Sequence, residues 1–344
     1  MLYHFMYKIL NFRTFGLLAS YCFVGFSLIC PCHPATGAKE VSNGASALEK
    51  PFPENIDDLT EIQDRLQSLL PSTMECLVAI EAGDGAGSGV IVSEDGLVLT
   101  AAHVIGSTGK KMNVKLSDGR EYRATSLGGS ELSDAGMLKI KTSESLPYAS
   151  LSPRNDSKVG DWCFAIGHPG GFDPERGPVV RLGRIIAKQD ETMQTDSRLL
   201  GGDSGGPLFD FNGKVIAIHS RVSSQPDENF HIPIESFHAN WEFFQDKKLF
   251  TLESLEQGGF LGVRCEERLN GLEILEVIED TPAYQAGLLA GDIIKQVDSI
   301  KIKTRETLTI HISGKNPGEI LRITYERGKK TMSSQIKLGY RGPQ

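Results

Sequence analysis

The stretch LLGGDSGGPLFDFNGKVIAIHS, which runs from Leu199 to Ser220, places four glycines around one serine and follows them with two short apolar segments. Glycine adopts backbone conformations that other residues avoid, and it lets a second chain approach closely. Two interpretations fit: Ser204 lies in a structural tight turn, or it is a nucleophile whose neighbouring amides face a substrate. A serine hydroxyl becomes a good nucleophile only when a base takes its proton and an acid orients that base. The second interpretation therefore requires a histidine and an acid in the same domain.

Both residue types precede Ser204. The segment GLVLTAAHVIG places His103 at the end of an apolar run, and ELSDAGMLKI places Asp134 where another run begins. Strand ends hold catalytic groups rigidly, and the chain order His, Asp, Ser is one in which this triad occurs. Taken singly, each residue has a structural explanation as a buried histidine, a strand-entry cap or a turn. Together they predict a catalytic triad of His103, Asp134 and Ser204, with the amides of Gly202 and Ser204 as the oxyanion hole.

Short apolar or alternating segments fill the chain from Cys76 to about Pro233, and Asp-Gly, Asn-Gly and Gly-Gly turns separate them. This texture is typical of an all-β barrel or sandwich. Apolar residues at helical spacing over 56–69 predict a helix that Pro71 ends, and residues 234–247 predict another. Residues 253–259 are expected to be a polar connection. After it the pattern predicts strands over 260–265 and 272–279, a short helix over 282–288, a strand over 292–298, a helix over 305–313, and strands over 320–328 and 333–340. That order indicates a small α+β domain.

The length of 344 residues predicts two globular domains. With 36 basic and 44 acidic residues the chain is acidic, so its composition lacks the excess positive charge typical of proteins that bind nucleic acid. Residues 1–38 run from charged through apolar to small side chains, which predicts a signal peptide or membrane anchor and hence export. Beyond them, Cys76, Cys163 and Cys265 form no disulfide framework and no metal pattern, and we expect neither metal nor cofactor.

The motifs TAAHV, SDAGMLKI and GGDSGGPL resemble those of chymotrypsin-like serine proteases, and are most similar to the HtrA (Deg) family, whose serine motif usually reads GNSGGPL. GGFLGV resembles the carboxylate-binding loop of a PDZ domain, and TPAYQAGLLAGDIIKQVD resembles the PDZ core of bacterial HtrA proteins. The resemblance covers roughly residues 74–340. It implies a mainly β fold, a chymotrypsin-like double β-barrel followed by a small α+β PDZ domain. The expected domains are a signal peptide or anchor (1–38), a linker and short helix (39–73), a trypsin-like protease domain (74–245) and a PDZ domain (253–344).

The resemblance also implies a function: a serine endopeptidase of envelope protein quality control, periplasmic or associated with the cell envelope, that cleaves unfolded or damaged polypeptides through an acyl-enzyme. The alternative is a peptide-binding chaperone or scaffold with little or no proteolysis. Family members often form trimers through an N-terminal segment, in which this chain has only Phe52 as an aromatic residue, so a homotrimer stays open. The PDZ domain implies binding of peptide C-termini in a groove made by Gly259, Phe260, Leu261, Gly262, Val263, Leu308 and Ile312.

Three departures from the family pattern concern the active site. Asp203 replaces the usual Asn. In digestive chymotrypsin-like enzymes an aspartate here receives a new N-terminal ammonium on activation, but the chain shows no obvious site for such a cleavage, so Asp203 needs another partner, which the sequence leaves unassigned. The segment GHPGGFDPERG differs from the usual G-N-P-F-G. Arg198 replaces a small residue near the pocket for the side chain that precedes the cut, and Arg221 and His231 fall on segments expected to form its walls.

Arg198 leaves two alternatives for specificity. If its guanidinium points inward with no carboxylate beside it, a substrate Asp or Glu is the natural partner. If it pairs with Asp196 or Asp203, or turns to solvent, the pocket is an apolar slot.

Overall fold

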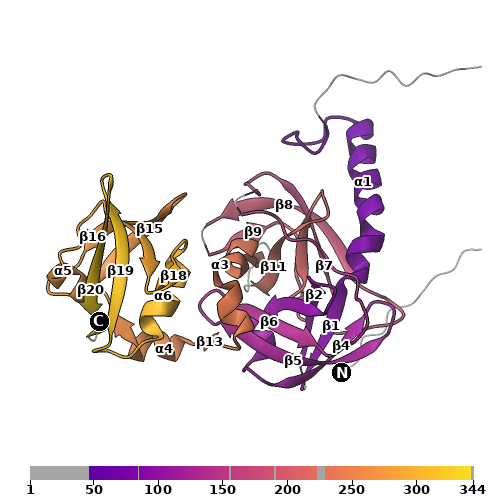
Figure 1. Ribbon diagram of the computed structural model, residues 1–344. Coiled ribbons are helices and arrows are strands. Elements are labelled where there is room, and N and C mark those ends of the chain that lie inside the picture. The colour runs from indigo at the N-terminus through magenta and orange to yellow at the C-terminus, as the bar shows by residue number, and fades with distance from the viewer. Residues whose placement is uncertain (1–45, 84, 155, 190, 223–228, 342–344) are drawn as a thin grey trace, which may run out of the picture. The chain divides into compact units, whose positions relative to one another are not determined.

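The structure, a computed structural model, describes residues 46–341 apart from 84, 155, 190 and 223–228 (Figure 1). The predicted export segment, residues 1–38, lies outside this range. Among the described helices, none is both long enough and apolar enough to cross a membrane.

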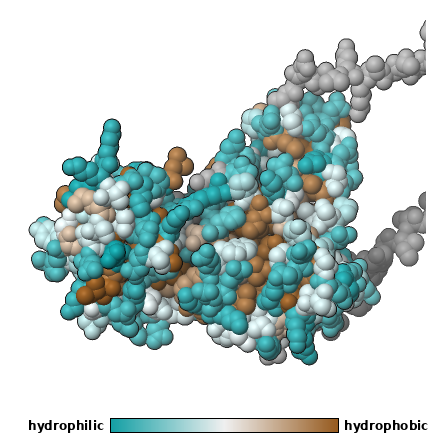
Figure 2. Space-filling view, viewed as in Figure 1, coloured by the Kyte–Doolittle hydropathy of each residue, from teal (hydrophilic) through white to brown (hydrophobic). Residues whose placement is uncertain are grey.

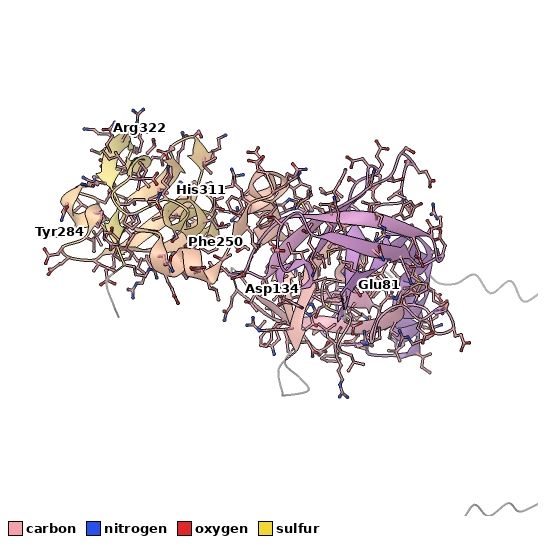
Figure 3. The ribbon with its side chains drawn as sticks, turned by 90° about the horizontal axis from the view of Figure 1, so that it is seen from below. Glu81, Asp134, Phe250, Tyr284, His311 and Arg322 are labelled. Carbon is pink, nitrogen blue, oxygen red and sulfur yellow. The ribbon has the colours of Figure 1, made fainter. Side chains whose placement is uncertain are left out.

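Six strands form the first barrel, and they lie in the order β5-β4-β1-β2-β3-β6, with pairing between β5 and β6 closing the sheet. A short strand, β13 (Leu249–Phe250), adds to β5 in parallel, and its Phe250 (Figure 3) is buried. The six are β1 (Leu77–Ala82), β2 (Gly85–Ile91), β3 (Leu97–Ala101), β4 (Lys111–Leu116), β5 (Glu121–Ser130) and β6 (Ala135–Ile140).

The second barrel is also closed, in the order β10-β11-β12-β9-β8-β7. Together the two barrels confirm the predicted chymotrypsin-like double β-barrel. The strands are β7 (Trp162–Gly167), β8 (Val179–Lys188), β9 (Met193–Thr195), β10 (Pro207–Asp210), β11 (Val215–Val222) and β12 (Asn229–Pro233).

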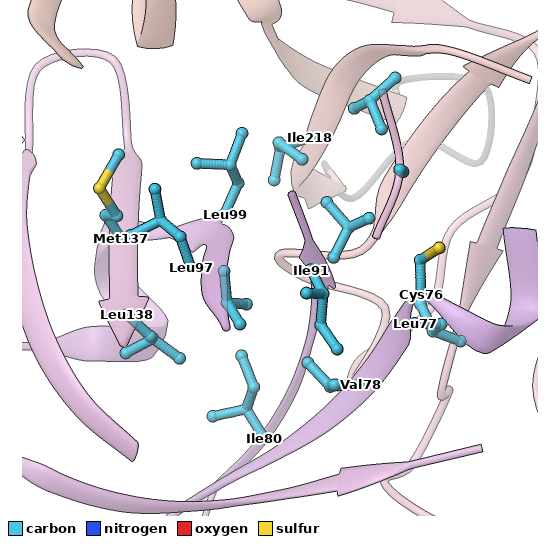
Figure 4. Packing of buried hydrophobic residues seen from close by; sticks show 14 of the residues in the cluster. Cys76, Leu77, Val78, Ile80, Ile91, Leu97, Leu99, Met137, Leu138 and Ile218 are labelled. Carbon is cyan, nitrogen blue, oxygen red and sulfur yellow. The ribbon is translucent and has the colours of Figure 1, made fainter. Parts of the chain in front are cut away.

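The two barrels share one hydrophobic core (Figure 4). Leu99 of β3 and Ile218 of β11 are both fully buried in the same cluster, so side chains far apart in sequence meet at the junction of the barrels. Each such side chain stabilises the fold by about 1.5–3 kcal/mol relative to an exposed position. This shared core fixes the strand ends that carry the candidate catalytic residues.

Helix α1 (Ile56–Glu75) precedes the barrels and begins at Asn55, whose side chain accepts a hydrogen bond from the N–H of Asp58. The prediction that Pro71 ends this helix is wrong. Proline removes one helical hydrogen bond, but Thr73, two residues later, is buried and Met74 packs against the core of the barrels. Packing of the last turn against the barrels therefore stabilises the helix beyond Pro71, as far as Glu75.

The three remaining helices before the C-terminal domain are short. They are α2 (Ala102–Ile105), between β3 and β4; α3 (Ile234–Gln245), which confirms the predicted second helix; and α4 (Leu252–Gln257), which falls on a stretch expected to be a polar connection.

The C-terminal domain is the predicted small α+β unit, with a sheet in the order β15-β16-β17-β19-β20. The strand expected over residues 260–265 is interrupted at Gly262. Its φ of 89° is unfavourable for other residues, and a Cβ there would collide with Thr281. The elements are β14 (Gly259–Phe260), β15 (Val263–Arg268), β16 (Gly271–Val277), α5 (Pro282–Gln285), β17 (Ile293–Val297), β18 (Ile300–Lys301), α6 (Arg305–Ser313), β19 (Ile320–Arg327), β20 (Lys330–Lys337) and β21 (Gly339–Tyr340).

Hydrophilic side chains predominate on the face shown in Figure 2, with apolar side chains in separate patches. On α1 the apolar stripe is only partly covered: Ile62 is buried, whereas Ile56 and Leu59 in the first turns are exposed. A homotrimer stays a prediction.

Candidate active site

The two barrel strands β3 and β6 bring His103 to Asp134. Ala101 and Ala135 are opposite each other in this pair, so the residues that continue past each strand end adjoin. His103 Nδ1 lies 2.9 Å from Asp134 Oδ2, and Asp134 Oδ1 accepts the backbone N–H of His103 at 3.0 Å. Asp134 has a φ of 63°, in the left-handed region that aspartate tolerates better than most residues. A carboxylate on Nδ1 leaves Nε2 of the imidazole to act as a base.

Ser220 links this pair to Ser204. Its hydroxyl donates to Asp134 Oδ2 at 2.6 Å, and its carbonyl accepts the Ser204 hydroxyl at 3.0 Å. Within the described residues no hydrogen bond joins Ser204 to His103, so the structure brings the three predicted residues to one site without the Ser–His contact. Catalytic hydrogen bonds are often loose until substrate binds. Sequence analysis missed Ser220, because its role depends on how β11 packs beside the first barrel.

The loop around Ser204 presents two backbone donors. These donors are the N–H groups of Gly202 and Ser204. Ser88 holds the loop through its carbonyls: the Ser88 hydroxyl donates to the carbonyl of Gly202 at 2.8 Å, and the Ser88 N–H donates to the carbonyl of Ser204 at 2.8 Å. The N–H groups of Gly202 and Ser204 donate to no acceptor among the described residues. Gly202 has a φ of 97°, and a Cβ there would lie 2.5 Å from the carbonyl oxygen of His168, so only glycine fits. This arrangement is suited to binding an oxyanion.

The charge state of the pair follows from its contacts. The hydrogen bond with Asp134 raises the pKa of His103 above its ordinary value, against the opposing effect of burial. Burial acts to raise the pKa of Asp134, but hydrogen bonds from His103 and Ser220 outweigh it and the pKa is lowered. Asp134 is therefore ionised over a wide pH range, and His103 becomes a neutral base only above its raised pKa.

The structure also provides the partner that sequence analysis left unassigned for Asp203. The fully buried carboxylate forms an ion pair with Arg181 of β8, with 3.1 Å between Asp203 Oδ2 and Arg181 Nη2. Arg181 and Asp203 are far apart in sequence and no local pattern connects them, so sequence analysis could not find this pair.

The three residues expected around the specificity pocket lie in different environments. Arg198 and Arg221 are exposed, and the guanidinium of Arg221 lies 5.5 Å from the ring of Phe230. His231 is buried and uses both ring nitrogens internally, one with His219 Nδ1 at 3.0 Å and the other with Thr195 Oγ1 at 2.8 Å. Burial lowers the pKa of His231 to about 3, so it is neutral. The exposed Arg198 favours an apolar slot over an acidic preference, and the roles of all three residues stay predictions.

In the C-terminal domain a small cavity of about 80 Å³ coincides with the predicted groove. Arg341, which sequence analysis missed, is the one cationic residue among the described residues that line it, because pairing of β21 with β14 places the chain end beside the loop. All seven predicted groove residues line the cavity: Gly259, Phe260, Leu261, Gly262, Val263, Leu308 and Ile312.

Comparisons with known proteins agree with this architecture. A family model described as trypsin-like peptidase domain matches residues 87–218, and one described as PDZ domain matches residues 259–338. The chain is 29% identical over 319 residues to a probable periplasmic serine endoprotease DegP-like of Rickettsia conorii, covering 86% of this chain and 61% of that protein. It is 31% identical over 274 residues to a protein of the same name from Ectopseudomonas mendocina, covering 74% and 56%. The chain thus spans less than two thirds of the length of these relatives.

Solved structures show the same similarity. The HtrA-type protease AlgW with tripeptide is 25% identical with a TM-score of 0.55, and the match covers 81% of this chain and 98% of that one. The serine endoprotease from Yersinia pestis is 26% identical with a TM-score of 0.52, covering 79% and 97%. Fold and site together define a trypsin-like peptidase domain followed by a PDZ domain. The two domain types, the DegP-like relatives and the HtrA-type structures confirm the resemblance to the HtrA (Deg) proteases.

Proposed function

We propose that the protein is a serine endopeptidase in which His103, Asp134 and Ser204 are the catalytic residues. The observation that carries the proposal is the connected site, in which His103 is hydrogen-bonded to Asp134 and Asp134 is linked through Ser220 to Ser204. The N–H groups of Gly202 and Ser204 donate to no acceptor in the part of the chain that the structure describes. That arrangement has the parts that acyl transfer to a serine requires.

The reaction proceeds through an acyl-enzyme. On substrate binding the Ser204 hydroxyl leaves the carbonyl of Ser220, loses its proton to His103 Nε2 and attacks the scissile carbonyl carbon. The Gly202 and Ser204 amides hold the oxyanion that forms, and Asp134 stabilises the imidazolium. His103 then protonates the leaving amine. In the second half, water gives a proton to His103 and its oxygen attacks the ester carbonyl carbon. His103 then returns a proton to Ser204 Oγ as the ester C–O bond breaks, which releases the new carboxyl terminus and restores the serine hydroxyl and the neutral base.

The proposed setting is envelope protein quality control, with unfolded or damaged polypeptides as substrates. The names of the relatives, which include the word periplasmic, support export to the periplasm or cell envelope. The family matches over residues 87–218 and 259–338 support the proposed protease domain (74–245) and PDZ domain (253–344). A linker and short helix over 39–73 precede them in the proposed organisation. A peptide-binding chaperone or scaffold with little proteolysis is the competing function.

One assay separates the two functions. Purified protein is incubated with denatured casein in the absence of ATP, beside the Ser204→Ala variant. We expect fragments from the wild type and none from the variant. Retention of intact casein by both proteins would contradict the endopeptidase and support the chaperone.

The activity should depend on pH through His103. Because only the neutral imidazole acts as a base, and its pKa is raised above the ordinary value of about 6.5, kcat/KM should fall as the pH drops through neutrality. At about pH 4.5 we expect a loss of at least about 100-fold. Circular dichroism over the same range controls for unfolding. Undiminished turnover of folded protein at that pH would exclude His103 as the base.

The PDZ cavity should bind a free C-terminal carboxylate. The N–H of Gly259 donates to the carbonyl of Lys315 at 2.7 Å, so the backbone amides from Phe260 to Gly262 are the ones expected to take the carboxylate. Leu308 and Ile312 are expected to contact the last side chain. In the Ser204→Ala background, which leaves peptides intact, a peptide ending in an apolar residue should bind about tenfold more tightly than its C-terminal amide in a calorimetric titration.

Two variants check this assignment. Leu308→Ser should weaken the acid form, and Ile320→Ser, on an exposed position outside the cavity, should not. Equal affinity for acid and amide would remove the carboxylate role.

A further inference from the structure

A buried ion pair lies directly behind the candidate nucleophile. The Asp203 side chain is fully buried and that of Arg181 is 15% exposed, with 3.1 Å between Oδ2 and Nη2. A buried carboxylate is strongly unfavourable unless a cation or hydrogen bonds compensate it. Arg181 therefore decides whether Asp203 can stay ionised inside the second barrel.

The Asp203 carboxylate holds the loop that carries the Gly202 and Ser204 amides. Its Oδ2 accepts the N–H of Leu200 at 2.8 Å, and the N–H of Asp203 donates to the carbonyl of Leu200 at 3.0 Å. On the other side, the carbonyl of Asp203 accepts the N–H of Gly206 at 2.8 Å. The peptide groups of Gly202 and Ser204 flank this residue directly, so the position of Asp203 sets the direction of their N–H groups.

Other groups around the pair leave Arg181 as the direct partner. A Cβ on Gly167 of β7 would collide with Asp203 Oδ1, so strand backbone covers that side of the carboxylate. Arg176 acts on Asp203 only at longer range, and its Nη2 donates to the carbonyl of Gly171. Burial lowers the pKa of His219, which faces Arg181, well below its ordinary value, so it adds no charge.

We propose that the Arg181–Asp203 ion pair holds the Gly202–Ser204 loop in its oxyanion-binding conformation, as an internal replacement for a terminal ammonium, so that catalysis needs no newly cleaved N-terminus. Arg181 is a positioning residue, because it acts through Asp203 and not on the substrate. The inference rests on the proposed endopeptidase function.

The test compares Arg181→Met with Lys188→Met. Lys188 lies on the same strand and pairs with Glu235 at 2.9 Å, with side chains 17% and 8% exposed, so it matches Arg181 in burial but lies away from the loop. On a short fluorogenic peptide at about pH 8, Arg181→Met should lose about 100-fold in kcat with little change in KM, since it disturbs the oxyanion donors. Lys188→Met should keep its kcat within about threefold, whatever its loss in Tm. An unchanged kcat in folded Arg181→Met would overturn the proposal.

The pH profile of Arg181→Met provides a readout that a purely structural role would not move. Burial already raises the pKa of Asp203, against the effects of the Leu200 N–H and Arg181. Without Arg181 the carboxyl stays protonated until higher pH, and its ionisation then leaves an unpaired buried charge. The kcat of Arg181→Met should therefore fall as the pH rises, whereas that of the wild type should not. Identical alkaline profiles would contradict the role of the pair.

Asp203→Asn completes a double-mutant cycle and covers the case in which Arg181→Met does not fold. The amide oxygen of asparagine can still accept the Leu200 N–H without a charge. The double variant Arg181→Met/Asp203→Asn should thus recover at least about tenfold in kcat over Arg181→Met, and should lie within about threefold of Asp203→Asn alone. If Arg181→Met lowers kcat about 100-fold in the Asp203→Asn background, Arg181 does not act through the Asp203 carboxylate. Failure of the endopeptidase itself is distinct, because the wild type would then be inactive.

Discussion

Replacing Asp134 with asparagine should lower kcat by about 10⁴-fold with little effect on KM. The carboxylate accepts hydrogen bonds from His103 Nδ1, from the His103 backbone N–H and from Ser220. An asparagine in its place can present an amide N–H to Nδ1, which selects the tautomer with the proton on Nε2 and removes the base. The variant should fold, because asparagine tolerates the positive φ of this position.

The measurement is kcat and KM on a fluorogenic peptide, with a thermal melt to confirm folding. Asp118→Asn is the matched control, since Asp118 is an exposed aspartate that pairs with Arg120 in a turn. It should leave kcat unchanged. A loss of less than about tenfold in Asp134→Asn would mean that the histidine is oriented by something else.

Replacing Ser204 with alanine should have a still larger effect, a loss of about 10⁶-fold in kcat, because no attacking oxygen remains. Only the hydroxyl and its hydrogen bond to the Ser220 carbonyl are removed. The hydrogen bonds that Ser88 donates to the carbonyls of Gly202 and Ser204 do not involve the Ser204 hydroxyl, so the melting temperature should change little. Binding of peptides in the PDZ cavity should persist.

Ser68→Ala, on an exposed part of α1, serves as the control for the substitution itself and should be fully active. Cleavage by Ser204→Ala above about 1% of the wild-type rate would point to another nucleophile. Such a result would leave the fold unchanged but refute the assigned triad.

Much of the fold could be predicted from the sequence, because short-range patterns determine it. The apolar segments ending at His103 and beginning at Asp134 form β3 and β6, and the turn glycines separate the strands as expected. Helix α6 occupies the predicted residues 305–313, where Thr304 caps its first turn. The loop glycines around Ser204 are locally specified, since the conformation of Gly202 allows no other residue.

What the sequence could not predict depends on closure of the barrels. Ser220 reaches Asp134 across 86 positions, and Arg181 reaches Asp203 only because β8 lies beside β7 in a closed sheet. Arg341 joins the PDZ cavity through the pairing of β21 with β14. Pro71 misled the helix prediction because burial of the last turn outweighs a local preference. In each case tertiary packing decided what local pattern could not.

Covalent labelling tests the central claim most directly. A fluorophosphonate reacts with an activated serine, whose Oγ displaces fluoride from phosphorus while the base accepts the proton. Intact mass measurement should show one adduct per chain, and peptide mapping should place it on Ser204. The adduct should be absent in Ser204→Ala, and it should form more slowly as the pH falls below the pKa of His103. No adduct on folded wild-type protein, or an adduct on a different serine, would contradict the account.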